Sequence, residues 1–146
     1  IMVNKKSHTE VDRETILTKD GVLRNEMLDY NQEIVSVNKI IEKNGISSSW
    51  SHTLVNTDSN SATLIAQMPG EGNRLHYHPD WNEWWYIIAG EWEWEIEGQK
   101  KTIIKGDVVF MEKEKKHKIT AKGSKMAIRL AVSRADVEHV YPRDSS

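Results

Sequence analysis

From Trp50 onward the chain is a series of short apolar segments, each about five to eight residues long, divided by turn-forming residues. In order, the segments are SWSHTLVN, SATLIAQM, RLHYH, EWWYIIA, EWEWEIE, KKTIIK, DVVFME, HKITA and KMAIRLAV. Segments of this length and composition are typical of strands, and the sequence TDSN between the first two predicts a hairpin. Many short strands at regular spacing indicate an all-β fold, either a sandwich or a closed barrel.

The N-terminal third of the chain has a different pattern of apolar residues. The apolar residues between Val11 and Tyr30 suit short helical turns. Residues 33–44 predict either a helix ended by Gly45 or a strand, because their periodicity fits both. We therefore expect an N-terminal arm over residues 1–48, built of helical turns, an exchanged strand or both, and one barrel domain over residues 49–146.

Composition excludes several classes of protein. The 146 residues carry a net charge of −2 with both signs mixed along the chain, which leaves no basic surface for nucleic acid. No apolar run is long enough to span a bilayer, and the polar N-terminal residues contain no secretory signal. We therefore expect a cytoplasmic protein without a nucleic-acid or membrane partner. The absence of cysteine rules out disulfides, thiolate metal ligands and cysteine nucleophiles.

Four side chains form the strongest candidate for a functional site. His76 and His78 are two residues apart, so on a strand their side chains share one face while Tyr77 points away. Glu83 opens the next apolar segment, and its carboxylate completes a set of ligands if the two strands run side by side. His117, at the start of a later strand, is the candidate for a fourth ligand.

Neutral imidazole and carboxylate ligands suit Fe, Mn, Co, Ni or Zn, and they leave coordination positions open for water or substrate. We expect one divalent transition metal per chain, with iron as the first expectation. A histidine without a partner at ligand spacing is usually a surface residue or a satisfied core residue. His8, His52 and His139 are of this kind, and the sequence predicts no role for them in the site.

The spacing around these residues resembles the first motif of the cupin superfamily. Gly70 is followed after five residues by His76-Tyr77-His78, after four more by Glu83 and after six more by Gly90, which matches the motif at every defined position. The resemblance covers roughly residues 50–132. It implies a small single-domain cupin, a jelly-roll β-barrel in which the four residues named above bind the metal and in which dimers are common.

A second cupin motif is matched in part, with Gly106, Asp107 and His117 in register. The departures are Glu112 for proline, Glu114 for glycine and Ala121 for asparagine. They change turn residues and leave the histidine in place. We therefore expect a loop before His117 that is more charged and more mobile than is usual in the family.

Three residues are candidates for contact with a substrate. Arg74 shares its strand face with the two neighbouring histidines, and an arginine inside the barrel needs an anionic partner, either a substrate or an internal carboxylate. Trp85 follows Glu83 on the inner face of its strand, and Trp94 lies on the inner face of the next strand. We expect one of these tryptophans to fill the barrel and the other to line the pocket.

The function expected from these features is that of a non-haem metal enzyme acting on a small, polar, anionic molecule. Oxygenase chemistry is the first expectation, and metal-assisted lyase or isomerase chemistry is the second. A non-catalytic module that binds or senses a small molecule is the alternative from another class. The segment RLHYHPDWNEWWYIIAG also resembles part of the oxalate decarboxylase cupins, but their arginine lies one position farther from the first histidine and they contain two barrels.

The strand EWWYIIA is apolar on both faces, which predicts that something covers its outer side. Trp84, Tyr86 and Ile88 form that outer face. Either the N-terminal arm or a second copy of the chain can cover it. We expect a homodimer with Trp84 and Tyr86 at or near the contact.

Overall fold

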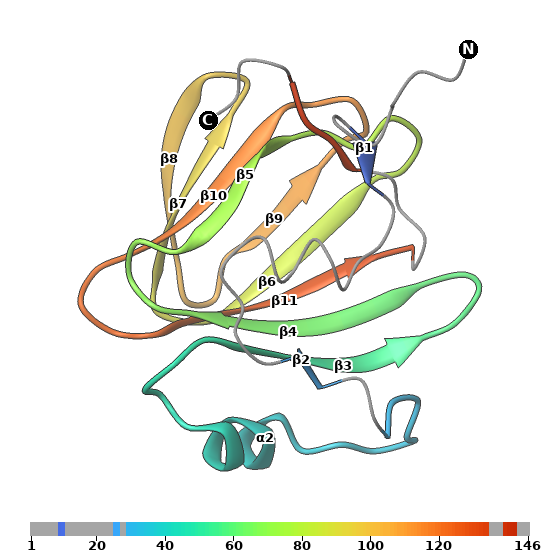
Figure 1. Cartoon of the computed structure of the whole chain (residues 1–146), viewed down its shortest axis with the longest axis vertical. Coiled ribbons are helices and arrows are strands. Elements are labelled where there is room, and N and C mark those ends of the chain that lie inside the picture. Colours follow the sequence, from blue (N-terminus) through green and yellow to red (C-terminus); the bar gives the residue numbers. More distant parts are fainter. Residues whose placement is uncertain (1–8, 11–24, 27–28, 135–138, 143–146) are drawn as a thin grey trace.

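The computed structural model describes residues 9–10, 25–26, 29–134 and 139–142, most of which form two largely antiparallel β-sheets that face each other (Figure 1). The larger sheet has the order β2 (Asn25–Glu26), β3 (Trp50–Asn56), β4 (Ser61–Gln67), β11 (Ala127–Ser133), β6 (Glu83–Ala89) and β9 (Val108–Met111). The smaller sheet has the order β5 (Gly72–His76), β10 (His117–Lys122), β7 (Glu91–Ile96) and β8 (Gln99–Ile104). The all-β jelly-roll barrel is confirmed, and each apolar segment expected to be a strand contributes one.

The core of the barrel is made by alternation along these strands. On β6, Glu83, Trp85 and Ile87 are buried, whereas Trp84 and Tyr86 are exposed. On β7, Trp92 and Trp94 are buried, and the intervening glutamates face outward. The inner cluster consists of Trp85, Ile87, Trp92, Trp94, Val109, Met111, Ile119, Ala121 and Ala127. Tryptophan side chains therefore supply much of the volume between the two sheets.

Gly90 makes the corner at which the chain passes from one sheet to the other. It connects β6 to β7 with a φ of +82°, a conformation that residues with a Cβ adopt rarely. A Cβ at this position would lie 2.6 Å from the Cα of Ala127 and 2.7 Å from its Cβ. Both the backbone conformation and the available space thus require glycine here.

The helical alternative for residues 33–44 is correct, because α2 spans Val37–Asn44. The Ser36 side chain accepts a hydrogen bond from the Lys39 N–H at 3.2 Å, and Gly45 ends the helix with a φ of +80°. Figure 1 shows the helix on the outer side of the larger sheet, beside β3. It buries Ile40 in a second apolar cluster with Trp50, Leu64, Ala66, Met126 and Ile128.

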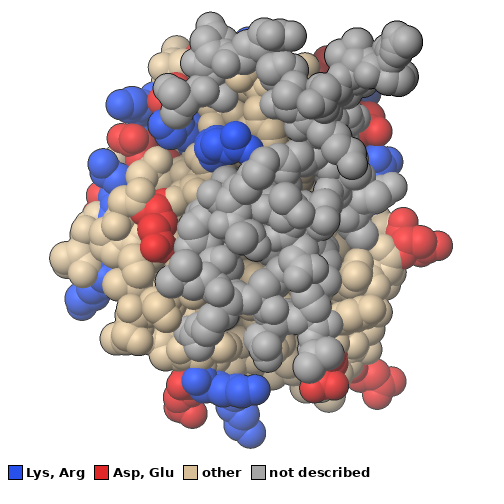
Figure 2. Space-filling model, viewed as in Figure 1, with Lys and Arg blue, Asp and Glu red and all other residues tan. Residues whose placement is uncertain are grey.

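Two short strands of the N-terminal arm pair with the barrel. β1 (Thr9–Glu10) pairs with β12 (His139–Val140), and β2 pairs in parallel with β3. The helical turns expected between residues 11 and 30 fall mainly outside the described residues. Among the described residues, no helix has the length and apolar character needed to cross a bilayer. On the face seen in Figure 2, acidic and basic side chains are interspersed around the periphery.

An apolar patch remains exposed on the outer face of β6 and β9. It consists of two cross-strand pairs, Trp84 with Phe110 and Tyr86 with Val108. Their exposed fractions are 40% and 61% for the first pair and 42% and 62% for the second. The cluster beneath α2 includes Ile88 at the other end of β6, but it contains none of these four residues. Contiguous exposed apolar residues of this kind mark interaction surfaces.

We propose that a second copy of the chain covers this patch, and we expect the protein to sediment at micromolar concentration as twice its 16.9 kDa. Trp84→Lys should weaken dimerisation at least about tenfold, or about 1.4 kcal/mol, because it replaces apolar contact area with a charge. Lys101→Gln, on the exposed face of β8, is the control and should leave the dimer intact. A monomeric wild-type protein would contradict the proposal.

Candidate metal centre

The structure brings the four side chains singled out from the sequence together inside the barrel. His76 and His117 are direct cross-strand partners on β5 and β10, and their ring centres are 4.3 Å apart. The ring of His78 lies 5.1 Å from that of His76 and 5.3 Å from that of His117. The Oε1 atom of Glu83 is 2.6 Å from the Nε2 atom of His78. All four side chains are buried.

The two sheets contribute differently to this cluster. His76 ends β5, and the backbone of Tyr77 continues the extended conformation by exchanging two hydrogen bonds with Val140, of 3.1 and 3.0 Å. This pairing is consistent with His78 lying on the same side as His76. Glu83, by contrast, begins β6, which belongs to the larger sheet. The condition under which the sequence placed Glu83 beside the histidines, that its strand runs next to β5, is not met, because β6 lies in the other sheet. The carboxylate instead faces the histidines across the barrel.

Backbone carbonyls orient two of the imidazole rings. The Nδ1 atom of His76 is 2.7 Å from the carbonyl oxygen of Arg74, and the Nδ1 atom of His117 is 2.9 Å from that of Lys115. A carbonyl can only accept, so each Nδ1 carries the proton and each Nε2 keeps its lone pair. The Nε2 of His117 is buried and has no hydrogen-bond partner in the part of the chain that the structure describes. Metal-ligating histidines typically donate the N–H of their other ring nitrogen to a backbone carbonyl or a carboxylate in this way.

Burial sets the protonation of the cluster. It lowers the pKa of His76 well below the ordinary value, and the neighbouring histidines lower it further. Burial, followed by the proximity of His78, lowers the pKa of His117 from 6.5 to about 4. Burial alone would raise the pKa of Glu83, but the adjacent imidazoles, chiefly His78, outweigh it and hold the pKa below its ordinary value. At neutral pH the cluster thus offers an ionised carboxylate and neutral imidazoles at His76 and His117, which are the protonation states that metal binding needs.

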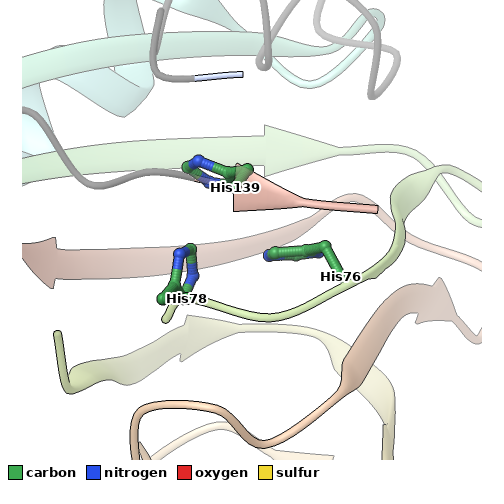
Figure 3. Close-up of side chains that lie close together, drawn as sticks. All are labelled: His76, His78 and His139. Atoms are coloured by element: carbon green, nitrogen blue, oxygen red, sulfur yellow. The ribbon is translucent and has the colours of Figure 1, made fainter. Parts of the chain in front are cut away.

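His139 is a further histidine beside the cluster that the sequence did not predict. Figure 3 shows its ring beside those of His76 and His78, from which it is 5.0 and 4.5 Å away. Two groups of side chains each offer ligand atoms within 4.8 Å of one another: His78, Glu83 and His117, and His76, His78 and His139. No spacing rule reveals His139, because only the pairing of β12 near residue 77 brings it here.

A cavity of about 50 Å³ opens beside the cluster. Its lining consists of Ser61, Thr63, Ile65, Asn73, Glu83, Trp85, Arg129, Ala131, Ser133 and His139. Trp85 thus forms part of the cavity wall. Trp94 is not among the lining residues and packs edge-on against Trp85 with ring centres 5.3 Å apart, so it fills the barrel. Contact of either residue with a substrate stays a prediction.

Arg74 is half-buried and does not line this cavity. Its guanidinium carbon lies 3.9 Å from the centre of the Tyr141 ring, and that ring lies 5.8 Å from the ring of His76. Arg74 is therefore close to the cluster but stacked on an aromatic face. A role in substrate binding stays a prediction for this residue.

The comparisons with known proteins agree with this geometry. The family model for the cupin domain matches residues 63–133, which include all four side chains of the cluster. This match, over just under half of the chain, and the fold together support a small cupin superfamily protein. No curated protein matches this cupin in sequence.

Solved structures share the fold of this cupin at low sequence identity. An uncharacterised double-stranded β-helix protein from Klebsiella pneumoniae is 18% identical with a TM-score of 0.64, over 76% of this chain and 93% of its own. A putative sugar phosphate isomerase from Acidithiobacillus ferrooxidans is 19% identical with a TM-score of 0.61, over 69% and 74%. A predicted oxalate decarboxylase from Thermotoga maritima is 25% identical with a TM-score of 0.56, over 60% and 81%.

The loop before His117, which carries two of the three departures from the second motif, is held by hydrogen bonds in this cupin. Glu114, which stands where the motif has glycine, adopts a φ of +74°. Its N–H donates a 2.6 Å hydrogen bond to the carbonyl oxygen of His78, and the N–H of Lys113 donates to the Asn82 side chain at 2.8 Å. The loop is thus tied to the segment that carries His78.

Two substitutions distinguish between the two groups of ligand atoms. We expect His117→Ala to weaken Co²⁺ binding at least about tenfold, because it removes a buried ligand, whereas His139→Ala should retain most of it. Spectroscopic titration of the metal-free protein, with circular dichroism to verify folding, measures both. The opposite ranking would assign the ion to the group that contains His139.

The metal-free protein should lose stability as the pH falls from about 6.5 to about 4. The pKa of His117 is lower in the folded chain than the ordinary 6.5, so the unfolded chain binds the proton first and acid favours unfolding. His117 alone should lower the free energy of unfolding by about 2 kcal/mol between pH 7 and pH 5, at about 1.4 kcal/mol per pKa unit. Urea denaturation at the two pH values measures this, and His117→Gln should make the dependence shallower. An unchanged pH dependence in that variant would contradict the assignment.

Proposed function

We propose that this cupin is a metal-dependent enzyme acting on a small, anionic molecule. The metal is one divalent transition ion held by His76, His78, Glu83 and His117, and iron is the first candidate. The observation that carries the proposal is the pair of Nδ1 hydrogen bonds to backbone carbonyls, which leaves the Nε2 lone pairs of His76 and His117 for an ion. A purely structural histidine in a core would also have a partner for its Nε2, which His117 lacks among the residues that the structure describes.

When bound, the metal supplies Lewis acidity and, in the case of iron or manganese, a redox couple. The chain's own residues supply the surroundings. Glu83 contributes the negative charge of the ligand set, and its burial limits competition from water. Trp85 forms an apolar wall beside Glu83, which keeps that side of the cavity dry and strengthens electrostatic contacts inside it.

Oxygenase chemistry is the first form of the proposal, because a ligand set of neutral imidazoles and one carboxylate suits iron and leaves coordination positions open. Lyase or isomerase chemistry is the second form. It is supported by the neighbours, which are described as a predicted oxalate decarboxylase and a putative sugar phosphate isomerase. In both forms the substrate is a small oxygen-rich anion that reaches the histidine cluster.

Comparing turnover under air and under argon tests the proposal. The iron-loaded and manganese-loaded proteins are incubated with oxalate, glycolate and pyruvate, and product formation is followed by NMR. Loss of substrate only under air supports the oxygenase form, and equal loss under both gases supports the lyase or isomerase form. His117→Ala is the control and should abolish either activity. Tight binding of an anion without any turnover would indicate a binding module and contradict an enzymatic role.

A further inference from the structure

A fully buried arginine that neither cupin motif includes lies inside the barrel. Arg129 is on the inner face of β11 with 1% of its surface exposed. Its guanidinium donates hydrogen bonds to the side-chain oxygens of Gln67 at 2.6 Å and Asn73 at 2.8 Å, and its central carbon lies 4.7 Å from the centre of the Trp92 ring. These contacts fix the plane of the guanidinium. Both acceptors are neutral amides, and the two bonds hold the guanidinium in a defined orientation.

Arg129 shares a cavity with the metal centre. The same cavity is lined by Glu83 and His139 from the histidine cluster. Its volume of about 50 Å³ holds a handful of non-hydrogen atoms, because one water needs roughly 10–15 Å³ measured in this way. The cavity thus limits the size of a ligand. A ligand in it would lie between Arg129 and the metal centre.

An unsatisfied hydroxyl lies in the wall of this cavity. Thr63 is buried on β4, and its Oγ1 has no hydrogen-bond partner among the residues that the structure describes. A buried polar atom without a partner is destabilising, and such atoms in native proteins call for an explanation. A ligand oxygen in the cavity would supply the missing hydrogen bond.

The charges favour an anion at this place. A divalent ion held by neutral imidazoles and the single carboxylate of Glu83 leaves a positive charge, and Arg129 places a guanidinium in the wall of the same cavity. Inside the barrel these charges are weakly screened, and they attract an anion more strongly than they would in water. A planar guanidinium also matches the geometry of a carboxylate.

We propose that Arg129 and Thr63 form a subsite for the carboxylate of a small 2-hydroxy or 2-oxo acid, whose second oxygen faces the metal centre. The inference deepens the proposed function and rests on it for the position of the metal. It assigns the anion to Arg129, in the cavity wall, and not to Arg74, which stacks on Tyr141 outside that wall.

Two matched ligands and four variants test the subsite. Calorimetric titration of the zinc-loaded wild-type protein should show that glycolate binds at least tenfold more tightly than its uncharged counterpart glycolamide. Arg129→Gln should reduce this preference severalfold, to the part that the bound ion alone provides. Lys122→Gln, which removes an exposed positive charge at the end of β10, should keep it.

Thr63→Val tests whether the Thr63 hydroxyl binds a ligand or only stabilises the fold. Removing a hydroxyl that has no partner should leave the melting temperature of the ligand-free protein unchanged or higher, while glycolate binding weakens severalfold. If Arg129→Gln does not fold, this variant and Arg129→Lys carry the test, and Arg129→Lys should weaken glycolate more than it weakens glycolamide.

The metal content of every variant is measured in parallel, so that failure of the proposed function and failure of the subsite can be told apart. A wild-type protein that binds no divalent metal overturns the proposed function, and glycolate binding to the metal-free protein then decides the subsite. Equal affinity for glycolate and glycolamide, unchanged glycolate affinity in both Arg129→Gln and Thr63→Val, or tighter binding of inorganic phosphate than of any small carboxylate would each overturn the subsite.

Discussion

The burial of three imidazoles and a carboxylate in an otherwise tryptophan-rich barrel is the constraint on which the rest of the structure depends. Ionisable groups in such a place are tolerated only if each polar atom has a partner or a ligand. The backbone meets this requirement for His76 and His117 by offering two carbonyl oxygens to their Nδ1 atoms. The pairing of Tyr77 with Val140 and the loop contact at Glu114 then hold the segment between them. These two contacts, which lie outside the regular strand pairing of the barrel, thus help to position the histidines of the cluster.

The strands and the candidate ligands could be predicted because both depend on local periodicity. Alternation along EWWYIIA correctly separates Glu83 and Trp85, which are inside, from Trp84 and Tyr86, which are outside. The glycine spacing adds a resemblance over roughly residues 50–132, which overlaps the family match over residues 63–133. Such patterns specify which face a side chain occupies, and they need no knowledge of the partner strand.

The features of the site that the sequence did not predict all depend on which strands lie next to or opposite one another. Glu83 faces the histidines from the opposite sheet, which no spacing within the chain reveals. His139 joins the cluster only through the pairing of β12, and Arg129 reaches the same cavity from β11. Alternation along AIRLAVS would have placed Arg129 on an inner face, but a lone cation in an apolar strand gives no indication of its neighbours. Contacts between residues far apart in sequence therefore define the cavity.

The conformation of Glu114 shows that motif glycines are of two kinds. At Gly90 a side chain would collide with Ala127, so the residue is dictated by space. At position 114 glutamate takes a positive φ, at a penalty of about 1 kcal/mol or somewhat more. A residue with a Cβ also has less conformational freedom than glycine in the unfolded chain. This lower entropy raises the free energy of unfolding by roughly 0.4–1 kcal/mol. The first effect exceeds the second, so glutamate leaves a net penalty on the order of 1 kcal/mol at this position. The fold tolerates that penalty, whereas the collision that a side chain would make at Gly90 leaves no room for any other residue.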